Sequence, residues 1–326
     1  MTDNFNRKIN YLRLAVTDRC NLRCTYCMPE EGLNWLKKDG ILSFEEMFRI
    51  SNLLVNAGVD KIRITGGEPF IRKDIDKFIG KLASIDKLKD IAITTNGTLT
   101  APYISQFKKW KINSCNLSLD ALDSDIFFGI TKRNDLDKVL DTIDLLLTEG
   151  IAIKINCVVM ENINTSEIPK MVAMTKDLPI SVRFIEEMPF NGDQKSYSGI
   201  QWNYTKILDT IKIAYPEIRK SFDPPNSTAY HYQIPGHSGN IGIIAAYSRS
   251  FCGTCNRIRL RPDGGFQTCL YGEPVLNVKN MMRAGLTDFE ILEFINNTLN
   301  YRAKDGWEAE KRNQFNQYSS MATIGG

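Results

Sequence analysis

Histidine is nearly absent from this sequence of 326 residues, which contains only His231 and His237. Both lie in a stretch rich in glycine, proline and serine, away from any regular strand or helix pattern. Because imidazole is the side chain that most often transfers protons in catalysis near neutral pH, histidine is a poor candidate for the source of an activity here. A zinc site closed by histidine is disfavoured for the same reason.

A strong net charge and long apolar runs are also missing. The 41 Lys and Arg residues nearly balance the 38 Asp and Glu residues, and the resulting net charge of +3 does not indicate binding to nucleic acid or to a membrane surface. No apolar run approaches the ~20 residues of a membrane span, and the first residues lack the apolar core of a signal peptide. With 43% hydrophobic residues, we expect a cytoplasmic enzyme with a sizeable core.

Among the residues that the sequence does contain, the cysteines are the most informative. Cys20, Cys24 and Cys27 form a C-x3-C-x2-C pattern directly after the apolar run 11–16. Three thiolates on one short loop can hold three corners of an iron–sulfur cube, and the missing fourth ligand leaves one iron open to a group that is not protein. The alternative is a zinc knuckle, but that site needs four Cys or His ligands, and no histidine follows to complete it.

A second group of three, Cys252, Cys255 and Cys269, has the pattern C-x2-C-x13-C and again lacks a fourth member. Two incomplete sets in one chain are much harder to explain by chance than one. The remaining cysteines, Cys115 and Cys157, lie in apolar runs and are most simply buried small hydrophobic residues.

Short β-branched runs alternate with amphipathic helical stretches from residue 11 to about residue 187. The expected strands are 11–16, 61–65, 91–95, 115–120, 153–159 and 180–186. A capping box of Ser43 and Glu46 should start one helix, and Gly150 should end the helix 135–149. Six such units predict an α/β fold, an incomplete (β/α)6 barrel of the TIM type. Functional residues should then cluster where its strands end.

The alternation stops near residue 191, and this divides the chain into two expected regions. Residues 1–190 form the partial barrel with the first cysteine set, and residues 191–326 form an irregular region with the second set and a Gly-Gly end. We expect the C-terminal region to close the open side of the barrel.

Two strand ends carry loop motifs in addition to the cysteines. Gly66-Gly67-Glu68-Pro69 follows the second expected strand and Thr95-Asn96-Gly97 follows the third. Either motif alone is a weak signal, because many strand-to-helix turns favour glycine and proline. Their shared position beside the cysteine loop makes them candidates for binding a ligand.

Cations inside apolar strands are a stronger signal. Arg13, Arg63, Lys154 and Arg183 lie within such runs, and an unpaired buried charge costs several kcal/mol. A polyanion such as a triphosphate would explain all four. Two alternatives stay open: some of these side chains could extend outward to solvent, or carboxylates at strand ends could pair with them. The carboxylates in question are Glu68, Asp120, Glu186 and Glu187.

A further group of cations follows the second cysteine set. Arg257, Arg259 and Arg261 alternate with Ile258 and Leu260, and this period of two predicts that the three guanidinium groups share one face of a strand.

The first cysteine set, with its neighbour Tyr26, resembles the signature of the radical S-adenosylmethionine (SAM) superfamily. The resemblance implies a [4Fe–4S] cluster whose open iron chelates SAM, followed by cleavage of SAM to methionine and a 5′-deoxyadenosyl radical. It also implies SAM contacts, by match to the family's motifs, at Tyr26, Gly67, Glu68, Ser118 and Met188. The scarcity of histidine agrees with chemistry that a cofactor performs.

The second cysteine set resembles that of MoaA-type GTP 3′,8-cyclases, and this resemblance covers nearly the whole chain. It implies conversion of GTP to 3′,8-cyclo-7,8-dihydro-GTP, the first step of molybdenum-cofactor biosynthesis. It further implies a second [4Fe–4S] cluster that binds the guanine, and a Gly325-Gly326 tail that enters the active site. The implied GTP contacts are Arg13, Arg63, Thr94, Lys154, Arg257 and Arg259, with Arg183 added by its position. Arg261 departs from the small hydroxyl residue that the family has there.

The resemblance also implies partners, namely an electron donor of the flavodoxin or ferredoxin type and a downstream enzyme that forms cyclic pyranopterin. A homodimer is compatible with it, and no nucleic acid or membrane partner is expected. Two other functions stay open: a twin-cluster radical SAM maturase acting on a peptide, and a non-catalytic zinc- or iron-binding interaction protein. A polyanion pocket would argue against the peptide substrate, and iron and sulfide analysis would test the interaction protein.

Overall fold

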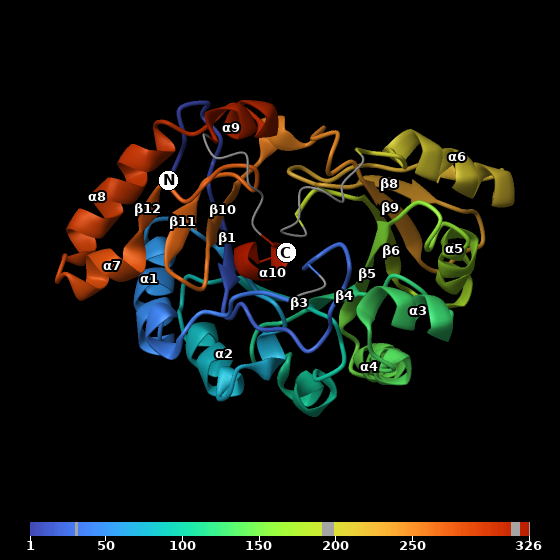
Figure 1. The fold of residues 1–326 in the computed structure, drawn as a ribbon, viewed down its shortest axis with the longest axis horizontal. Helices are drawn as coiled ribbons and strands as arrows, with labels where there is room; N and C mark the ends of the chain where they lie inside the picture. Colours follow the sequence, from blue (N-terminus) through green and yellow to red (C-terminus); the bar gives the residue numbers. More distant parts are fainter. Residues whose placement is uncertain (30–31, 191–198, 314–319, 326) are drawn as a thin grey trace.

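The computed structural model describes residues 1–29, 32–190, 199–313 and 320–325, and its centre is a curved parallel sheet with helices on the outside (Figure 1). The first six strands pair in chain order. They are β1 (Tyr11–Ala15), β2 (Lys61–Thr65), β3 (Asp90–Thr95), β4 (Ser114–Ser118), β5 (Ala152–Val159) and β6 (Ser181–Glu186). All six expected strands are confirmed to within two residues at each end.

The helices that connect these strands begin and end where local chemistry predicts. They are α1 (Phe44–Asn56), α2 (Ile75–Ala83), α3 (Ser124–Thr131), α4 (Leu136–Thr148) and α5 (Glu167–Asp177), with a 3-10 helix at Ala101–Gln106 between β3 and β4. Ser43 and Glu46 form both bonds of the expected capping box at the start of α1. After α4, Gly150 adopts a φ of 64°, the left-handed conformation that ends a helix.

The C-terminal region extends the sheet at both edges, which the sequence pattern did not reveal. β9 (Asn240–Ile244) pairs in parallel with β6, and β10 (Arg257–Leu260) pairs in parallel with β1. Antiparallel strands continue from each: β8 (Tyr230–Gln233) and β7 (Arg219–Lys220) beyond β9, and β11 (Gly265–Gln267) and β12 (Leu276–Asn277) beyond β10. Because β9 and β10 do not pair in the described sheet, the barrel stays open, as an incomplete barrel should.

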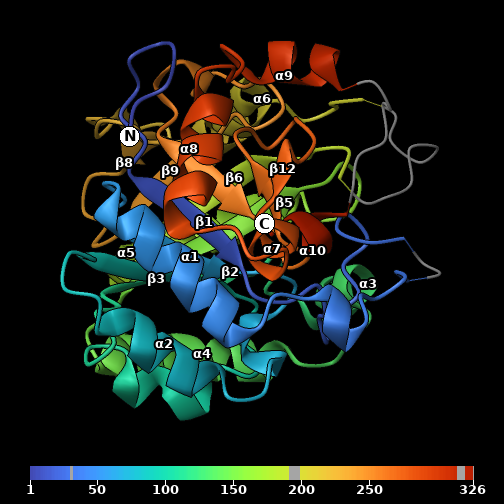
Figure 2. The same ribbon diagram turned by 90° about the vertical axis from the view of Figure 1, so that its left-hand side faces the viewer.

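The remaining helices all come from the C-terminal region. They are α6 (Tyr204–Ala214), α7 (Val278–Arg283), α8 (Asp288–Leu299), α9 (Gly306–Arg312) and α10 (Met321–Ile324). Figure 2 shows α7 and α8 packed beside α1 on the outside of the sheet. In Figure 1, α10 lies by contrast in the hollow of the curved sheet. None of the helices in the described ranges is long and apolar enough to cross a membrane.

Strand alternation decides which side chains face the hollow. Leu12 and Leu14 of β1 are completely buried in the main hydrophobic core, while Arg13 between them lines an internal cavity. Parallel pairing then aligns Arg13 with Arg63 of β2 on one side and with Arg259 of β10 on the other. The sheet therefore places three arginines side by side on its inner surface.

Candidate active site

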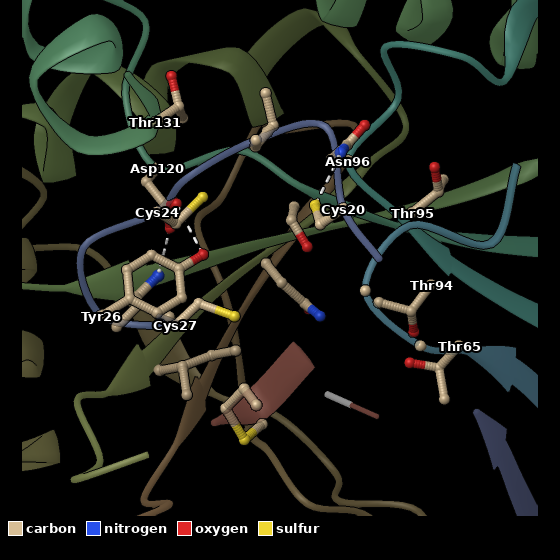
Figure 3. A pocket seen from close by; sticks show the side chains of 18 of the residues that line it. Cys20, Cys24, Tyr26, Cys27, Thr65, Thr94, Thr95, Asn96, Asp120 and Thr131 are labelled. Carbon is tan, nitrogen blue, oxygen red and sulfur yellow. Dashed lines mark hydrogen bonds between the residues drawn. The ribbon is translucent and has the colours of Figure 1, made fainter. Parts of the chain in front are cut away.

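The first cysteine set lies in a cavity of about 170 Å³ at the ends of the parallel strands (Figure 3). We call this space the thiol cavity. Cys20, Cys24 and Cys27 all line it, and burial raises the pKa of the Cys20 thiol to about 11. Among the described residues, no three Cys, His, Asp or Glu side chains converge on a single ion. The thiols stand around the cavity wall, which gives room for a group larger than one ion.

Four of the expected SAM contacts line the same cavity as the thiols, and so does Thr94, an expected GTP contact. The lining includes Tyr26, Gly67, Ser118, Met188 and Thr94. The Tyr26 hydroxyl donates to a carboxylate oxygen of Asp120 at 3.0 Å (Figure 3), and the backbone N–H of Val158 donates to the other oxygen at 2.8 Å. Burial raises the pKa of Asp120 to about 6. Sequence reasoning named Asp120 only as a partner for cations, although its place directly after β4 was a signal for the site.

Glu68, also an expected SAM contact, lies behind the cavity wall. Its side chain is fully buried, and its carboxylate accepts hydrogen bonds from the backbone N–H groups of Phe70 and Asn96 and from the Thr95 hydroxyl. Burial raises its pKa to about 7, although these donors act in the opposite direction. The carboxylate therefore joins the loops after β2 and β3, and Glu68 is not part of the described cavity lining.

The two glycines before Glu68 allow another segment to approach their backbone closely, and in the structure that segment is the cysteine loop. A Cβ on Gly67 would lie 2.2 Å from the carbonyl oxygen of Arg19, and one on Gly66 would lie 2.5 Å from that of Thr17. Hydrogen bonds run between the same segments, from Gly67 N–H to Thr17 O at 2.9 Å and from Glu68 N–H to Arg19 O at 2.8 Å. The glycine motif thus fixes the cysteine loop.

Replacement of Gly67 by alanine should therefore displace the cysteine loop, because the added methyl group meets fixed backbone and not a movable side chain. We expect a clear loss of the iron bound at the first cysteine set, measured by iron and sulfide analysis after anaerobic reconstitution. Gly129→Ala is the matched control, since a Cβ there meets nothing within 4 Å. Equal iron content in the two variants would contradict this role of Gly67.

A second and larger space, of about 460 Å³, adjoins the first and is strongly basic. We call it the cationic cavity. Its cationic lining residues are Arg13, Lys61, Arg63, Lys154, Arg183, Arg257 and Arg259. Among the described residues that line it, none is Asp or Glu. The volume lies in the range of natural ligand sites.

Several of these cations have nitrogen atoms without partners in the described protein. The Nε atoms of Arg13, Arg183 and Arg257 are buried with no hydrogen-bond acceptor in the described ranges. Burial, together with repulsion from Arg259 and Arg63, holds the pKa of Arg13 well below its usual range. Burial beside Arg183 likewise lowers the pKa of Lys154 to about 8. Each shift shows that these charges destabilise one another and would be stabilised by an anion.

The carboxylates that might have paired with these cations are mostly engaged elsewhere. Glu68 and Asp120 accept the bonds described above. Glu186 accepts from the backbone N–H groups of Tyr204 at 2.7 Å and Ser248 at 2.8 Å. Burial alone raises the pKa of the fourth, Glu187. The cavity thus favours an external anion over internal ion pairs.

The second cysteine set lies on the wall of the cationic cavity. Cys252, Cys255 and Cys269 all line it, as do two residues of β10, Arg257 and Arg259. Burial raises the pKa of the Cys252 thiol to about 11, and the neighbouring Cys269 and Cys255 add to the rise. Three thiols on the wall of one cavity have the same form as the first set, and they fit a second cluster with an open iron.

Arg261 does not belong to this group. β10 ends at Leu260, Arg261 is absent from the described lining of the cavity, and its guanidinium pairs with Asp263 at 3.5 Å. Sequence reasoning missed several other lining residues, among them Tyr11 and Lys61. Each of these two lies two residues before a predicted cation on the same strand, so the period of two was a usable signal.

The two cavities meet at four shared residues, which are Asn156, Ile185, Met188 and Met321. Met321 begins α10, so the end of the chain lies at this junction. The Arg259 guanidinium donates to the carbonyl oxygen of Gly325 at 2.8 Å. Gly325 has a φ of 84°, and a Cβ there would lie 2.7 Å from that of Ala15. Gly326, the other expected tail residue, lies outside the described residues.

Comparison with known proteins agrees with this geometry. The family described as Radical SAM superfamily matches residues 14–175, and the family described as Molybdenum Cofactor Synthesis C matches residues 180–307. A GTP 3′,8-cyclase of Clostridium botulinum is 44% identical over 282 residues, which cover 86% of this chain and 87% of that relative. The chain belongs to the GTP 3′,8-cyclase family.

Other members of this family are longer. Molybdenum cofactor biosynthesis protein 1 of Dictyostelium discoideum is 43% identical over 91% of this chain but only 48% of the relative. The chain thus spans about half the length of several curated relatives it matches. Among solved structures, SuiB of Streptococcus suis bound to S-adenosylmethionine has a TM-score of 0.59 at 17% identity, covering 86% of this chain and 63% of SuiB. This likeness supports the radical SAM fold.

Proposed function

We propose that the protein is a GTP 3′,8-cyclase that binds SAM and two [4Fe–4S] clusters and converts GTP to 3′,8-cyclo-7,8-dihydro-GTP. The observation that carries this proposal is a pair of adjoining cavities, one lined by three thiols and the other by three further thiols together with a group of Arg and Lys side chains. Residues 1–190 would hold the SAM end and residues 191–326 the second cluster. When bound, the first cluster and SAM supply the chemistry that removes a hydrogen atom from the GTP ribose.

The chain's own residues bind and orient both small molecules. Cys20, Cys24 and Cys27 hold the first cluster, and SAM lies against Tyr26, Gly67, Ser118 and Met188, with Glu68 contributing through its backbone. The Tyr26–Asp120 hydrogen bond fixes the ring beside the thiols. Since this cavity opens at Met188 into the cationic cavity, SAM and GTP can meet there without leaving the hollow.

The cationic cavity binds the triphosphate, and the base would lie beside the cluster that Cys252, Cys255 and Cys269 would hold. The residues that hold GTP are Arg13, Arg63, Thr94, Lys154, Arg183, Arg257 and Arg259. The register of β10, β1 and β2 supports this, because it aligns three of the arginines on one surface. Converging guanidinium groups are how proteins commonly bind phosphate. Cys252, Cys255 and Cys269 would place a cluster beside this row, where its open iron can contact guanine.

Lys154 makes GTP binding depend on pH. Burial and the nearby Arg183 lower its pKa to about 8. Burial acts to raise the pKa of Tyr11, but the charges of Arg63 and Arg13 outweigh it and bring that pKa to about 8 as well. Below pH 8, Lys154 is charged and Tyr11 is neutral, which favours a polyanion; above it, both changes oppose binding. We expect roughly a tenfold loss of GTP affinity between pH 7.5 and 9, measured by equilibrium dialysis.

Lys154→Arg should flatten this profile, because arginine stays charged throughout that pH range. Tyr11→Phe tests the smaller contribution that ionisation of Tyr11 makes to this pH dependence. Affinity that is constant from pH 7.5 to 9 in the unmodified protein would contradict the placement of Lys154 against the phosphates.

The Gly-Gly end of the chain acts in the cyclisation step. For Gly325, burial against Ala15 and the bond from Arg259 oppose a frayed terminus. Deletion of Gly325 and Gly326, or Gly326→Ala, should leave iron content and GTP binding largely intact and severely lower formation of cyclised product. The melting temperature should hardly move, because the core does not include these residues.

Gly325→Ala has a matched control in Gly236→Ala. Both glycines have a φ near 80°, but a Cβ on Gly236 meets nothing within 4 Å. Product yield measured by chromatography should fall for the first and persist for the second. Full yield from the truncated protein would show that the tail has no catalytic part.

An electron donor of the flavodoxin or ferredoxin type and a downstream enzyme that forms cyclic pyranopterin are the partners this function requires. The alternative substrate, a peptide, does not account for the cationic cavity. The deciding experiment is turnover of anaerobically reconstituted protein with SAM, dithionite and either GTP or no GTP. Cyclised GTP together with 5′-deoxyadenosine supports the proposal, whereas 5′-deoxyadenosine with unchanged GTP would refute it.

A further inference from the structure

A buried arginine that the sequence reasoning did not single out lies against the second cysteine set. Arg302 follows α8 and is only 3% exposed. Its guanidinium donates to the sulfur of Cys255 at 3.2 Å and to the carbonyl oxygens of Cys255 and Arg257, each at 3.0 Å. One planar side chain thus contacts the sulfur of a proposed iron ligand and also binds the backbone of that residue and of the residue two positions after it.

The position of Arg302 is fixed from behind by the N-terminal loop. Its guanidinium pairs with the Asp3 carboxylate at 3.3 Å, and Asp3 is itself buried and pairs with Arg7 at 2.6 Å. Backbone N–H groups of Phe5 and Arg7 donate to the other Asp3 oxygen at 2.9 and 3.0 Å. The Arg7 guanidinium also donates a hydrogen bond to the carbonyl oxygen of Cys252 at 3.1 Å. Arg302 is therefore held rigidly in one orientation.

The charged side chains beside the second cysteine set carry a net positive charge, which an anion would balance. Asp3 is shared by two arginines, so the group retains a net positive charge next to the thiols. The first cysteine set differs, since the side-chain donors at its sulfurs among the described residues are neutral: the amide of Asn96, 3.8 Å from Cys20, and the hydroxyls of Tyr26 and Ser320 at Cys24 and Cys27. A short bond from a charged donor to a ligating sulfur stabilises the more negative, reduced form of a cluster and raises its reduction potential.

We propose that Arg302 sets the reduction potential of the second iron–sulfur cluster through its N–H bond to the Cys255 sulfur. This role rests on the proposed cluster at Cys252, Cys255 and Cys269. Arg302 is a positioning residue, because it acts through the cluster ligand and lies outside the described lining of the cationic cavity.

The test measures the potential directly, without substrate. Cys24→Ala protein, which should retain only the second cluster, is reconstituted with iron and sulfide and titrated with dithionite and redox mediators, and the reduced cluster is followed by electron paramagnetic resonance. Adding Arg302→Gln should lower the ratio of reduced to oxidised cluster at a fixed potential by about tenfold, which is about 59 mV for a one-electron couple.

Arg7→Gln is the matched control. Like Arg302→Gln, it removes one of the two positive charges that pair with Asp3, and it removes a hydrogen bond to the loop of the second cysteine set. The difference is that Arg7 donates to a backbone carbonyl oxygen of this loop, whereas Arg302 donates to a sulfur. The proposal requires a distinctly smaller shift for Arg7→Gln. Equal shifts in the two variants, with the cluster retained in both, would overturn it.

If Arg302→Gln loses the cluster, its reduction potential cannot be measured, and the same titration of Arg302→Lys tests the proposal instead. Lysine keeps the charge but cannot serve the sulfur and two carbonyl oxygens with a planar fork, so the ratio should still fall, and an unchanged ratio would overturn the proposal. A protein that binds no iron at Cys252, Cys255 and Cys269 even with Arg302 in place would instead refute the proposed second cluster, and these two failures are distinguished by the iron count.

Discussion

Cys24→Ala should reduce the cleavage of SAM to background while the second cluster remains near full occupancy. The unmodified protein should carry about eight irons, since each [4Fe–4S] cluster contributes four, and the variant about half of them. The physical reason is that Cys24 is one of three thiols around the thiol cavity, whereas the second set lines the adjoining cavity and not this one. Formation of 5′-deoxyadenosine in the presence of dithionite is the measurement.

Cys115→Ala is the control for this change. Cys115 is a fully buried residue of β4 that lines neither cavity in the described structure, so its loss should affect packing and not iron content. Normal production of 5′-deoxyadenosine by Cys24→Ala would mean that SAM binds elsewhere.

The second large effect concerns the cationic cavity. Arg257→Ala should weaken GTP binding by about tenfold or more and stop cyclisation, because a charge-assisted hydrogen bond contributes about 1.5–3 kcal/mol. Slow, uncoupled cleavage of SAM should persist, since the thiol cavity is untouched. Cys255→Ala should behave similarly through loss of the cluster that clamps guanine. Equilibrium dialysis of GTP and quantification of 5′-deoxyadenosine separate the two effects.

Arg261→Ala provides a neighbouring arginine that should be nearly neutral. Its guanidinium pairs with Asp263 and is not part of the described lining of the cationic cavity. Equal losses of GTP affinity in Arg257→Ala and Arg261→Ala would show that overall charge near β10, and not the cavity itself, governs binding.

The sequence predicted those features that depend on local spacing. Strands β1 to β6, the capping box at Ser43 and the C′ glycine at Gly150 each follow from patterns within a few residues. The thiols could be assigned to two sets because their spacing is short. The cations of β1, β2, β5 and β6 were recognised because charge inside an apolar strand is conspicuous.

What the sequence did not show depends on pairing between distant segments. The parallel pairing of β10 with β1 joins residues far apart in the chain, and no local pattern reports it. The same holds for the close contact of Gly67 with Arg19. From the sequence, Gly67 was expected only to approach a ligand. Arg302 was missed because an arginine at the end of an ordinary helix carries no signal until the fold brings it to Cys255.

The most direct test of the proposed function is the fate of the hydrogen on the 3′ carbon of GTP. Anaerobically reconstituted protein is incubated with SAM, dithionite and GTP deuterated at this carbon, and the 5′-deoxyadenosine formed is analysed by mass spectrometry. Joined cavities that bring SAM and GTP together predict that one deuterium appears in 5′-deoxyadenosine, in step with the cyclised product. Release of 5′-deoxyadenosine without deuterium, and with GTP unconsumed, would contradict the account.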